Sequence, residues 1–277
     1  MDFNPKRETQ KITIFIKNVL KQTNHQKVVL GLSGGIDSAV SLCLLKQSIP
    51  KSNIIVAHLY YFEPLNIEFL TNDLPKKNIH NISIKEIVDE IFHLEDGKTK
   101  SLLPGGRVER SESHDSWDGG TPENDSSEVE RLRFGNIAAR VRMILLYDLA
   151  KKYKGLVCGT ENKSEYLLGY FTRFGDEASD FEPIRHLYKT QVYELAKYLK
   201  VPDEIIKTEP TAGLWPGQTD EKELGFTYFD ADQVLNLYFD EKLNIEEIKK
   251  QGFPNAEKII KRTKENSYKH QTPYTLE

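Results

Sequence analysis

The sequence predicts an α/β protein built on a doubly wound parallel sheet with helices on both faces. Short apolar runs alternate along the 277 residues with segments whose apolar residues recur at helical spacing. Strands that alternate with helices are typical of a parallel sheet, because each crossover lays a helix against the sheet. The apolar runs are continuous, as expected for strands that are buried on both sides.

The expected elements follow one another without an internal repeat. Residues 5–22 predict an amphipathic helix, because one face carries apolar residues at helical spacing: Ile12, Phe15, Ile16, Val19 and Leu20. The other helices are expected at 37–47, 136–153 and 188–199, and strands are expected within 27–35 and at 53–60, 79–84 and 155–160. Two polar helices are expected to close the chain.

Two segments are predicted to be loops. Residues 95–131 are rich in Gly, Ser, Asp and Glu and have no sustained period, so we expect a mobile surface insertion. Residues 209–225 are dense in Pro and Gly. Both loops are candidate lids over a binding site. Residues 1–277 are expected to form a single domain that carries the insertion.

Composition excludes several classes of function. A formal net charge of -4 argues against general nucleic-acid binding, which needs basic surface. No apolar run is long enough to span a bilayer, and the polar N-terminus lacks a signal-peptide core, so we expect a cytoplasmic protein without membrane contact. Cys43 and Cys158 are too isolated for a zinc site or a disulfide framework and are expected to be core residues.

The segment that follows the first apolar run has the chemistry of a phosphate loop. Its two adjacent glycines let backbone N–H groups approach an anion, and the helix behind it adds a partial positive charge. It is neither a Walker loop nor a dinucleotide fingerprint, because GxxxxGK[ST] and GxGxxG are both absent. The predicted phosphate-binding residues of this loop are Gly31, Leu32, Ser33, Gly34, Gly35, Ile36, Asp37 and Ser38.

Asp37 is the acidic residue of this loop. A carboxylate beside a phosphate site repels its ligand unless a cation bridges them. Mg²⁺ prefers one or two carboxylates together with phosphate oxygens and water. We therefore expect Asp37 to be a magnesium ligand, although an acidic residue in a first helical turn also stabilises the helix.

The SGGxDS pattern resembles the loop of the N-type ATP pyrophosphatases, which cleave ATP between the α- and β-phosphates. That resemblance implies a Rossmann-like, adenine nucleotide alpha hydrolase-like fold. Four later segments resemble the ammonia-dependent NAD synthetases: NIAARVRM at 136–143, GTENKSEYLLGYFTRFGDEASD at 159–180, PIRHLYKTQVYELA at 183–196 and EPTAGLWPGQTDEKELG at 209–225.

This resemblance implies roles for individual residues. It makes Asp37, Glu165 and Lys189 catalytic, with Asp37 and Glu165 holding Mg²⁺. It makes residues 31–38 the loop that binds the phosphates of ATP, and it gives Thr160, Lys189 and Thr211 as further ATP contacts. The implied deamido-NAD contacts are Arg140, Arg173, Asp180, Lys269 and His270.

The chain departs from the family at several of these positions. Arg173 stands where the family often has lysine, and Lys269-His270 reverses a common His-Lys order. Residues 61–78 also differ from the family, which leaves adenine recognition open, and the insertion at 95–131 is longer than expected.

The implied reaction is the ATP-dependent amidation of deamido-NAD to NAD through an adenylate, with release of AMP and pyrophosphate. We expect no second domain that would release ammonia from glutamine, so the expected nitrogen source is free ammonia or a separate ammonia-supplying protein. The resemblance also implies a homodimer. The alternatives are a catalytically inactive ATP-binding regulator of the same fold and another N-type ATP pyrophosphatase, either GMP synthetase-like or tRNA-modifying.

Overall fold

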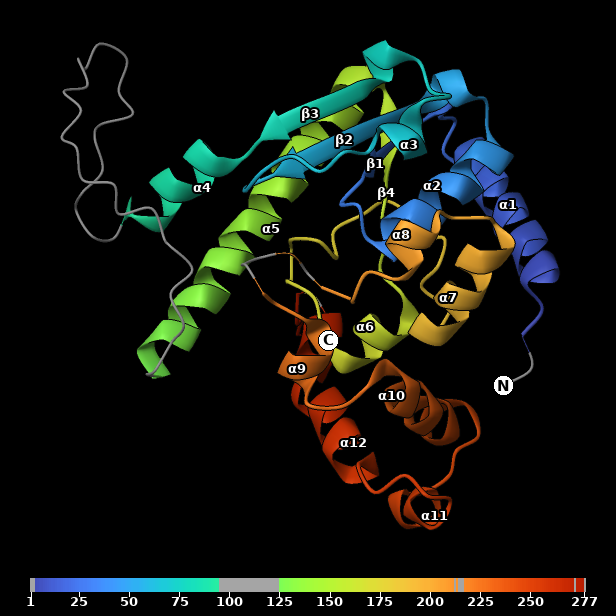
Figure 1. Cartoon of the computed structure of the whole chain (residues 1–277), viewed down its shortest axis with the longest axis vertical. Coiled ribbons are helices and arrows are strands. Elements are labelled where there is room, and N and C mark those ends of the chain that lie inside the picture. Colours follow the sequence, from blue (N-terminus) through green and yellow to red (C-terminus); the bar gives the residue numbers. More distant parts are fainter. Residues whose placement is uncertain (1–2, 95–124, 212, 214–216, 272, 277) are drawn as a thin grey trace.

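The structure is a computed structural model that describes residues 3–94, 125–211, 213, 217–271 and 273–276, without the side chains of 125–128. Four parallel strands form a sheet in the order β3-β2-β1-β4 (Figure 1). Their bounds are β1 Lys27–Gly31, β2 Ile54–Tyr60, β3 Ile79–Ser83 and β4 Gly155–Cys158. The chain runs outward from β1 to β3 and then returns to add β4 on the other side of β1. The direction of winding therefore reverses between β1 and β4, where ligands of open α/β sheets bind.

Successive residues of each central strand bury their side chains on opposite faces of the sheet. Val28 and Leu30 of β1 belong to one core, whereas Val29 belongs to the other. All three are fully buried. This arrangement explains why the predicted strands are continuous apolar runs, and it confirms the predicted parallel sheet.

Helices cover both faces of the sheet and also form a separate lobe. The helical bounds are α1 Pro5–Gln22, α2 Ile36–Ser48, α3 Glu68–Thr71, α4 Lys85–Phe92, α5 Asp125–Tyr153, α6 Lys163–Leu168, α7 Lys189–Tyr198, α8 Asp203–Ile206, α9 Asp220–Leu224, α10 Tyr228–Leu235, α11 Ile245–Lys250 and α12 Ala256–Glu265. Four short turns complete the described elements: η1 Lys51–Asn53, η2 Lys76–Asn78, the π-helical η4 Asn236–Asp240 and η5 Ser267–His270.

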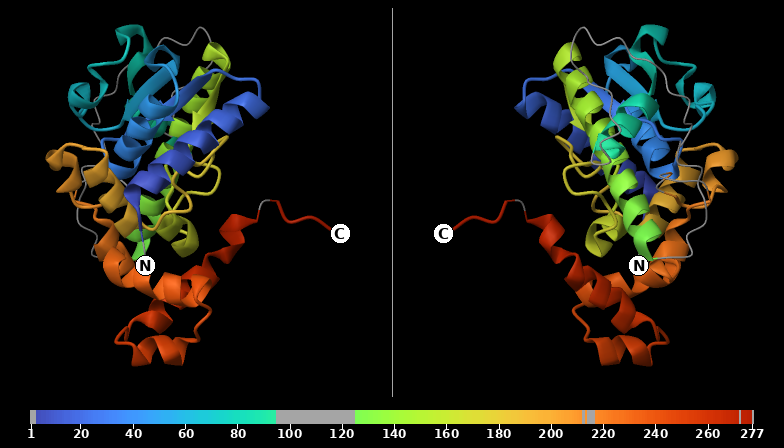
Figure 2. Two further views of the ribbon diagram at one scale, coloured as in Figure 1. Left: turned by 90° about the vertical axis from the view of Figure 1, so that its right-hand side faces the viewer. Right: turned by 90° about the vertical axis from the view of Figure 1, so that its left-hand side faces the viewer.

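Each layer has its own apolar cluster. α1, α2, α7 and α8 pack on one face of the sheet, and α4 and α5 pack on the other. A third cluster lies in the lobe formed by α10, α11 and α12, where Val234, Leu235 and Ile259 are fully buried. Figure 2 shows this lobe beyond the carboxyl ends of the strands, with the C-terminal end projecting away from the body. The lobe therefore faces the carboxyl ends of the strands.

Three sequence predictions need correction. The long helix was expected from residue 136, but α5 already begins at Asp125, so 125–131 is not part of a loop. Its first turns are rich in helix-forming residues, but Val129 and Leu132 are exposed, so no apolar face signals the helix. The loop at 209–225 contains the short helix α9. The described C-terminal part contains the helices α10, α11 and α12, whereas two polar helices were expected. Helix α10 did not fit that expectation, because it is mostly apolar and buried. The predicted insertion at 95–124 lies outside the described residues.

No helix in the described ranges combines the length and the apolar character that a membrane crossing requires.

Asp232 of α10 joins the C-terminal lobe to the helices beside the sheet. Its carboxylate is fully buried and accepts hydrogen bonds from the Ser164 hydroxyl and, at 2.8 Å, from the Thr190 backbone N–H. We expect Asp232→Ala to lower the free energy of unfolding by on the order of 2 kcal/mol, because both buried donors lose their acceptor. Urea unfolding measures this difference. Asp230→Ala, on the same helix but partly exposed, is the matched control. An equal effect in the two variants would contradict the proposed anchoring.

Candidate active site

The predicted phosphate loop lies between β1 and α2. Gly34 has φ +86°, in the left-handed region that favours glycine, and Gly35 is the N-cap of the 13-residue helix α2. Ser33 Oγ accepts a hydrogen bond from the Gly35 N–H at 3.2 Å, and the Ser38 hydroxyl donates to the Gly35 carbonyl at 3.0 Å. These contacts fix the loop around the helix N-terminus, which is suited to bind an anion.

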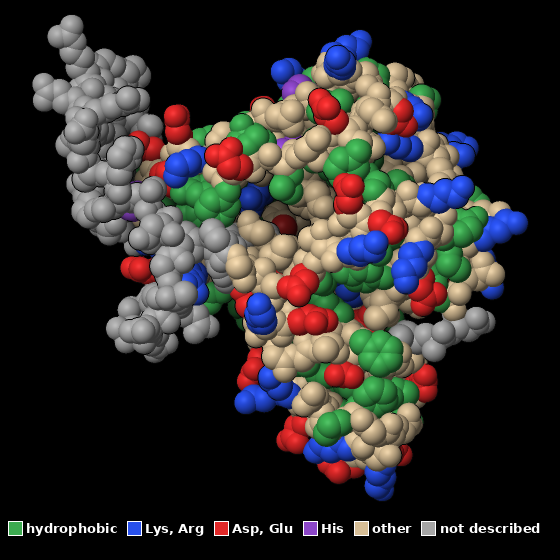
Figure 3. Space-filling view, in the orientation of Figure 1, with side chains coloured by type: hydrophobic (Ala, Val, Ile, Leu, Met, Phe, Trp, Pro, Cys, Tyr) green, Lys and Arg blue, Asp and Glu red, His purple; other side chains and the backbone are tan. Residues whose placement is uncertain are grey.

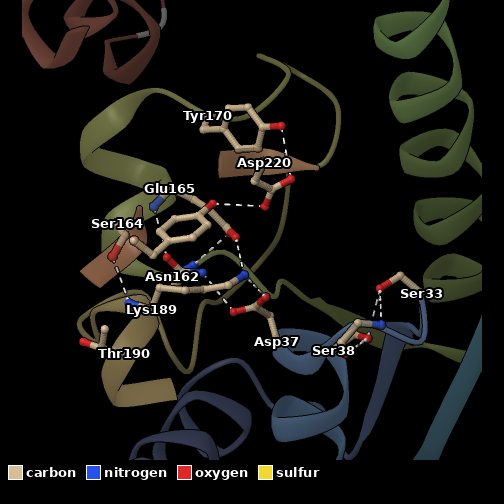
Figure 4. A network of polar contacts seen from close by, with 12 residues as sticks. Ser33, Asp37, Ser38, Asn162, Ser164, Glu165, Tyr170, Lys189, Thr190 and Asp220 are labelled. Carbon is tan, nitrogen blue, oxygen red and sulfur yellow. Dashed lines mark hydrogen bonds and ion pairs between the residues drawn. The ribbon is translucent and has the colours of Figure 1, made fainter. Parts of the chain in front are cut away.

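Three of the predicted catalytic residues meet at one point, beyond the carboxyl ends of β1 and β4. Lys189 Nζ lies 2.6 Å from Asp37 Oδ2 and 2.9 Å from Glu165 Oε1 (Figure 4). The three side chains come from the first turns of α2, α6 and α7. The lysine side chain is only 3% exposed, compared with 16% and 17% for the two carboxylates. The carboxylates therefore form the accessible side of the cluster.

The Asn162 side chain contacts both acidic residues of the cluster. Its Nδ2 donates to Asp37 Oδ1 at 2.9 Å, and its Oδ1 accepts from the Glu165 backbone N–H at 3.0 Å (Figure 4). The second bond is part of a capping box that starts α6. Asn162 is fully buried, so the same side chain starts the helix and positions Asp37.

Asp220, from the Pro- and Gly-rich segment, adds a third carboxylate to the cluster. It is buried and accepts hydrogen bonds from the Tyr170 and Tyr228 hydroxyls, each at 3.1 Å. The Lys189 ammonium also lies 5.2 Å from the centre of the Tyr228 ring, within range of a cation–π contact. The predicted loop segment therefore reaches the cluster through α9.

Electrostatics keeps Lys189 charged. Burial alone would lower the pKa of this lysine, but attraction by Asp37, Glu165 and Asp220 holds the pKa well above its usual value. Burial raises the pKa of Glu165 against the attraction of Lys189, and it raises the pKa of Asp220 in the same way. Three carboxylates thus surround a single ammonium group. Figure 3 shows the front of the molecule hollowed at its centre, with an acidic side chain visible inside.

These carboxylates fit the requirements of a magnesium site. Oxygens of Asp37 and Glu165 already converge on one cation, the Lys189 ammonium, within 2.9 Å. Within the described residues, no group of three or more His, Cys, Asp and Glu side chains is arranged to hold a metal ion. A site with two carboxylates is still the usual arrangement for Mg²⁺ that also binds substrate phosphates.

A second group of predicted residues meets at the edge of the C-terminal lobe. Arg140 donates to the Arg173 carbonyl at 3.2 Å, and Arg173 donates to the Gln271 carbonyl at 3.3 Å. Lys269 Nζ donates to the Gly169 carbonyl at 2.7 Å and to the Phe171 carbonyl at 3.0 Å. Three of the five predicted deamido-NAD contacts are thus drawn together from α5, the 169–173 loop and the C-terminal segment.

The other predicted contacts have partners outside these two groups. His270 Nε2 contacts the Tyr166 carbonyl at 2.6 Å, beside the second group. Asp180 accepts from the Val157 N–H of β4 at 2.7 Å, which ties it to the sheet. Thr211 is exposed, and its hydroxyl accepts from the Gly213 N–H at 3.0 Å. Thr160 is half-buried two residues after β4. No contact in the described residues links Thr211 or Thr160 to the lysine cluster.

A buried acidic pair lies next to Thr160. Glu161 is 6% exposed, and neither of its carboxylate oxygens accepts a hydrogen bond from a described residue, although Arg185 Nε lies 3.4 Å away. Glu182 accepts from the Glu161 backbone N–H at 3.1 Å and from the Ser179 hydroxyl at 2.8 Å. Burial raises the pKa of Glu161 to about 9 and that of Glu182 to about 7, against the attraction of Arg185.

The sequence predictions missed Asn162 and Asp220. Asn162 had a signal, because Asn followed three residues later by Glu165 is a capping-box pattern at the start of a helix. Its bond to Asp37, 125 residues earlier in the chain, has no local signal. Asp220 looks like an ordinary acidic residue in a first helical turn, and only the tertiary structure brings it near Lys189.

Comparisons with known proteins agree on one family. The sequence profile of the family described as NAD synthase matches residues 8–105 and 112–273. The NH(3)-dependent NAD(+) synthetase of Fusobacterium nucleatum is 36% identical over 279 aligned residues, which cover 99% of this chain and 96% of the relative.

Solved structures give the same result. The NMN synthetase from Francisella tularensis has a TM-score of 0.74 and 30% identity, and the alignment covers 99% of both chains. The NH3-dependent NAD synthetase from Campylobacter jejuni, in complex with the nitrate ion, has a TM-score of 0.72 and 29% identity, with 99% of this chain and 100% of that chain covered. The adenine nucleotide alpha hydrolase-like fold expected from the resemblance is thus confirmed.

The buried Glu161 predicts how stability depends on pH. Its pKa in the folded protein is about 9, compared with 4.5 for an exposed Glu, so the folded state holds the proton more tightly. The associated stability is fully present below about pH 4.5 and is lost as pH rises toward about 9. We expect Glu161→Gln to lose less stability than the parent between these pH values. Thermal unfolding at several pH values measures this, with the exposed Glu86→Gln as control. Parallel pH profiles for parent and Glu161→Gln would contradict the assigned ionisation.

Proposed function

The chain belongs to the NAD synthase family, and on this premise we propose that the Asp37–Lys189–Glu165 cluster is the active site of an ammonia-dependent NAD synthetase. The protein is an ATP-dependent ligase that amidates deamido-NAD to NAD. The observation that carries the site assignment is the convergence of two carboxylates and one buried lysine next to the phosphate loop. Such a cluster has the charges that a cation–polyphosphate complex requires.

Each part of the site has a role in forming the adenylate. Backbone N–H groups of residues 33–38 bind phosphate oxygens at the N-terminus of α2. Lys189 offsets negative charge on the polyphosphate, and Asn162 keeps Asp37 in place. Asp37 and Glu165 would hold Mg²⁺, which supplies charge neutralisation and orients phosphate oxygens. The nicotinate carboxylate of deamido-NAD attacks the α-phosphorus, and pyrophosphate leaves.

The second half of the reaction forms the amide. Ammonia attacks the carbonyl carbon of the adenylate, AMP leaves, and a proton is released. Arg140, Arg173, Asp180, Lys269 and His270 are proposed to bind the dinucleotide, and Thr160 and Thr211 to contact ATP. Contacts that already join Arg140, Arg173 and the C-terminal segment support a common binding surface. Water must be excluded, because it would hydrolyse the adenylate.

Several further properties are proposed beyond the reaction itself. We propose that residues 1–277 form one domain, that the protein is cytoplasmic, and that ammonia arrives free or from a separate protein.

A homodimer is also proposed. It is supported by an apolar groove between α4 and α5, where Leu94, Val129 and Leu132 are exposed. Light scattering of the purified protein tests the homodimer, and a monomeric mass at micromolar concentration would reject it.

Product analysis tests the proposed reaction. Incubation with deamido-NAD, ATP, Mg²⁺ and ¹⁵N-ammonium is expected to yield ¹⁵N-labelled NAD, AMP and pyrophosphate in equal amounts. An inactive regulator would bind ATP and produce none of them.

One neighbour is an NMN synthetase, so nicotinate mononucleotide is a second candidate substrate. A higher kcat/KM for the mononucleotide than for deamido-NAD would replace the proposed substrate.

Variants of the two carboxylates test the site. We expect Asp37→Ala and Glu165→Gln each to lower kcat about a hundredfold or more, because each removes charge stabilisation that acts on the transition state. Circular dichroism checks that the fold is retained. Glu194→Gln, on the exposed face of α7, is the matched control and should keep full activity. Normal turnover in either carboxylate variant would remove that residue from the site.

A further inference from the structure

His58 of β2 is a buried polar residue that the proposed chemistry does not use. It is only 3% exposed, and both of its ring nitrogens contact the backbone of other segments. Nδ1 lies 2.9 Å from the Leu32 carbonyl, and Nε2 lies 3.1 Å from the Leu65 N–H. A carbonyl can only accept and an N–H can only donate, so the two bonds require the tautomer with hydrogen on Nδ1. His58 therefore joins two loops through one fixed orientation of its ring.

Of the two groups that His58 contacts, one lies in the phosphate loop and the other lies beside it. Leu32 is a residue of the loop, and its own N–H donates to the Ala57 carbonyl of β2 at 2.9 Å. The Leu65 side chain lies against Gly34, since a Cβ on that glycine would be 2.9 Å from Leu65 Cδ1. One histidine thus ties the start of the phosphate loop to the residue that packs on its turn.

The segment that His58 holds has little else to order it. Residues 62–66 are all exposed and lie outside helices and strands, and Leu65 is 58% exposed. This segment differs from the family pattern, so the resemblance does not indicate which residues recognise adenine. An exposed leucine beside a phosphate loop offers an apolar surface to the base and ribose of a nucleotide. Such a surface raises affinity most when it is ordered before the ligand arrives.

We propose that His58 is a positioning residue for ATP: by bonding Leu32 and Leu65 it holds the 62–66 segment against the phosphate loop. The proposal rests on ATP being the substrate of this site. The histidine itself touches neither phosphate nor metal ligand. Its loss should therefore weaken ATP binding, while the binding of deamido-NAD at the other group of residues is unchanged.

Two variants of His58 separate its hydrogen bonds from its bulk. His58→Phe keeps a buried ring but loses both bonds, and we expect it to raise both the Kd and the KM for ATP about tenfold, with KM for deamido-NAD unchanged. His58→Gln keeps one donor and one acceptor and should recover most of the affinity. The Kd is measured by calorimetry with a non-hydrolysable ATP analogue, so this readout does not need turnover.

Asn78 provides the matched control. Its buried Nδ2 donates to the Ser52 and Ile54 carbonyls, each at 2.9 Å, at the opposite end of β2. Asn78→Leu should lower the unfolding temperature without changing the affinity for ATP. If His58→Phe behaved in the same way, His58 would be only a structural residue and the proposal would be wrong.

Leu65→Ala tests the route through which His58 acts. This side chain is exposed, so the variant should fold normally, and we expect it to weaken ATP binding as well. In the Leu65→Ala background, His58→Phe should have little further effect, because both changes act through the same contact. Fully additive effects, or unchanged ATP affinity in Leu65→Ala alone, would overturn the proposal. Formation of NAD by the parent protein would leave the proposed function intact in either case.

Discussion

The attraction between the Lys189 ammonium and the carboxylates of Asp37 and Glu165 is the interaction on which the rest of the site depends. A lysine that is 2% exposed overall would lose several kcal/mol of solvation, and it stays charged only because partners surround it. Those partners come from two helices that lie far apart in the sequence, α2, which begins at Ile36, and α6, which begins at Lys163. The contact therefore links two halves of the fold, and loss of either half would leave an uncompensated buried charge.

Sheet topology explains why these helices meet. The order β3-β2-β1-β4 puts β1 and β4 side by side, with the helices that follow them leaving toward the same edge. The first turns of those helices carry Asp37 and Glu165. The C-terminal lobe is joined to these helices through Asp232, which accepts hydrogen bonds from Ser164 of α6 and from Thr190 of α7, the residue after Lys189. Polar residues collect at this edge because it is where backbone N–H groups at helix starts remain available to a ligand.

Local chemistry made much of this predictable from sequence. The glycine pair and Asp37 indicate a phosphate loop on physical grounds, and continuous apolar runs indicate the buried strands. Glu165 and Lys189 were assigned only through the family resemblance, because each alone looks like an ordinary helix residue. Asn162, Asp220 and His58 could not be assigned, since each depends on a tertiary contact: Asp37 lies 125 residues from Asn162, and Leu32 lies 26 residues from His58. The start of α5 was missed because its early apolar residues are few, and Val129 and Leu132 are exposed, so periodicity gave no signal there.

The charge balance of the site supports the proposal that a cation binds with the nucleotide. Asp37, Glu165 and Asp220 surround one ammonium group, and burial already raises the pKa of Glu165 and of Asp220 because their charged forms lack solvent. A polyphosphate brought next to these groups would add further negative charge. Lys189 carries one positive charge against three carboxylates and a nucleotide, so the proposed divalent cation would bind carboxylate and phosphate oxygens together. The same carboxylates would repel free ATP, so the proposed site would favour the nucleotide that arrives with a metal ion.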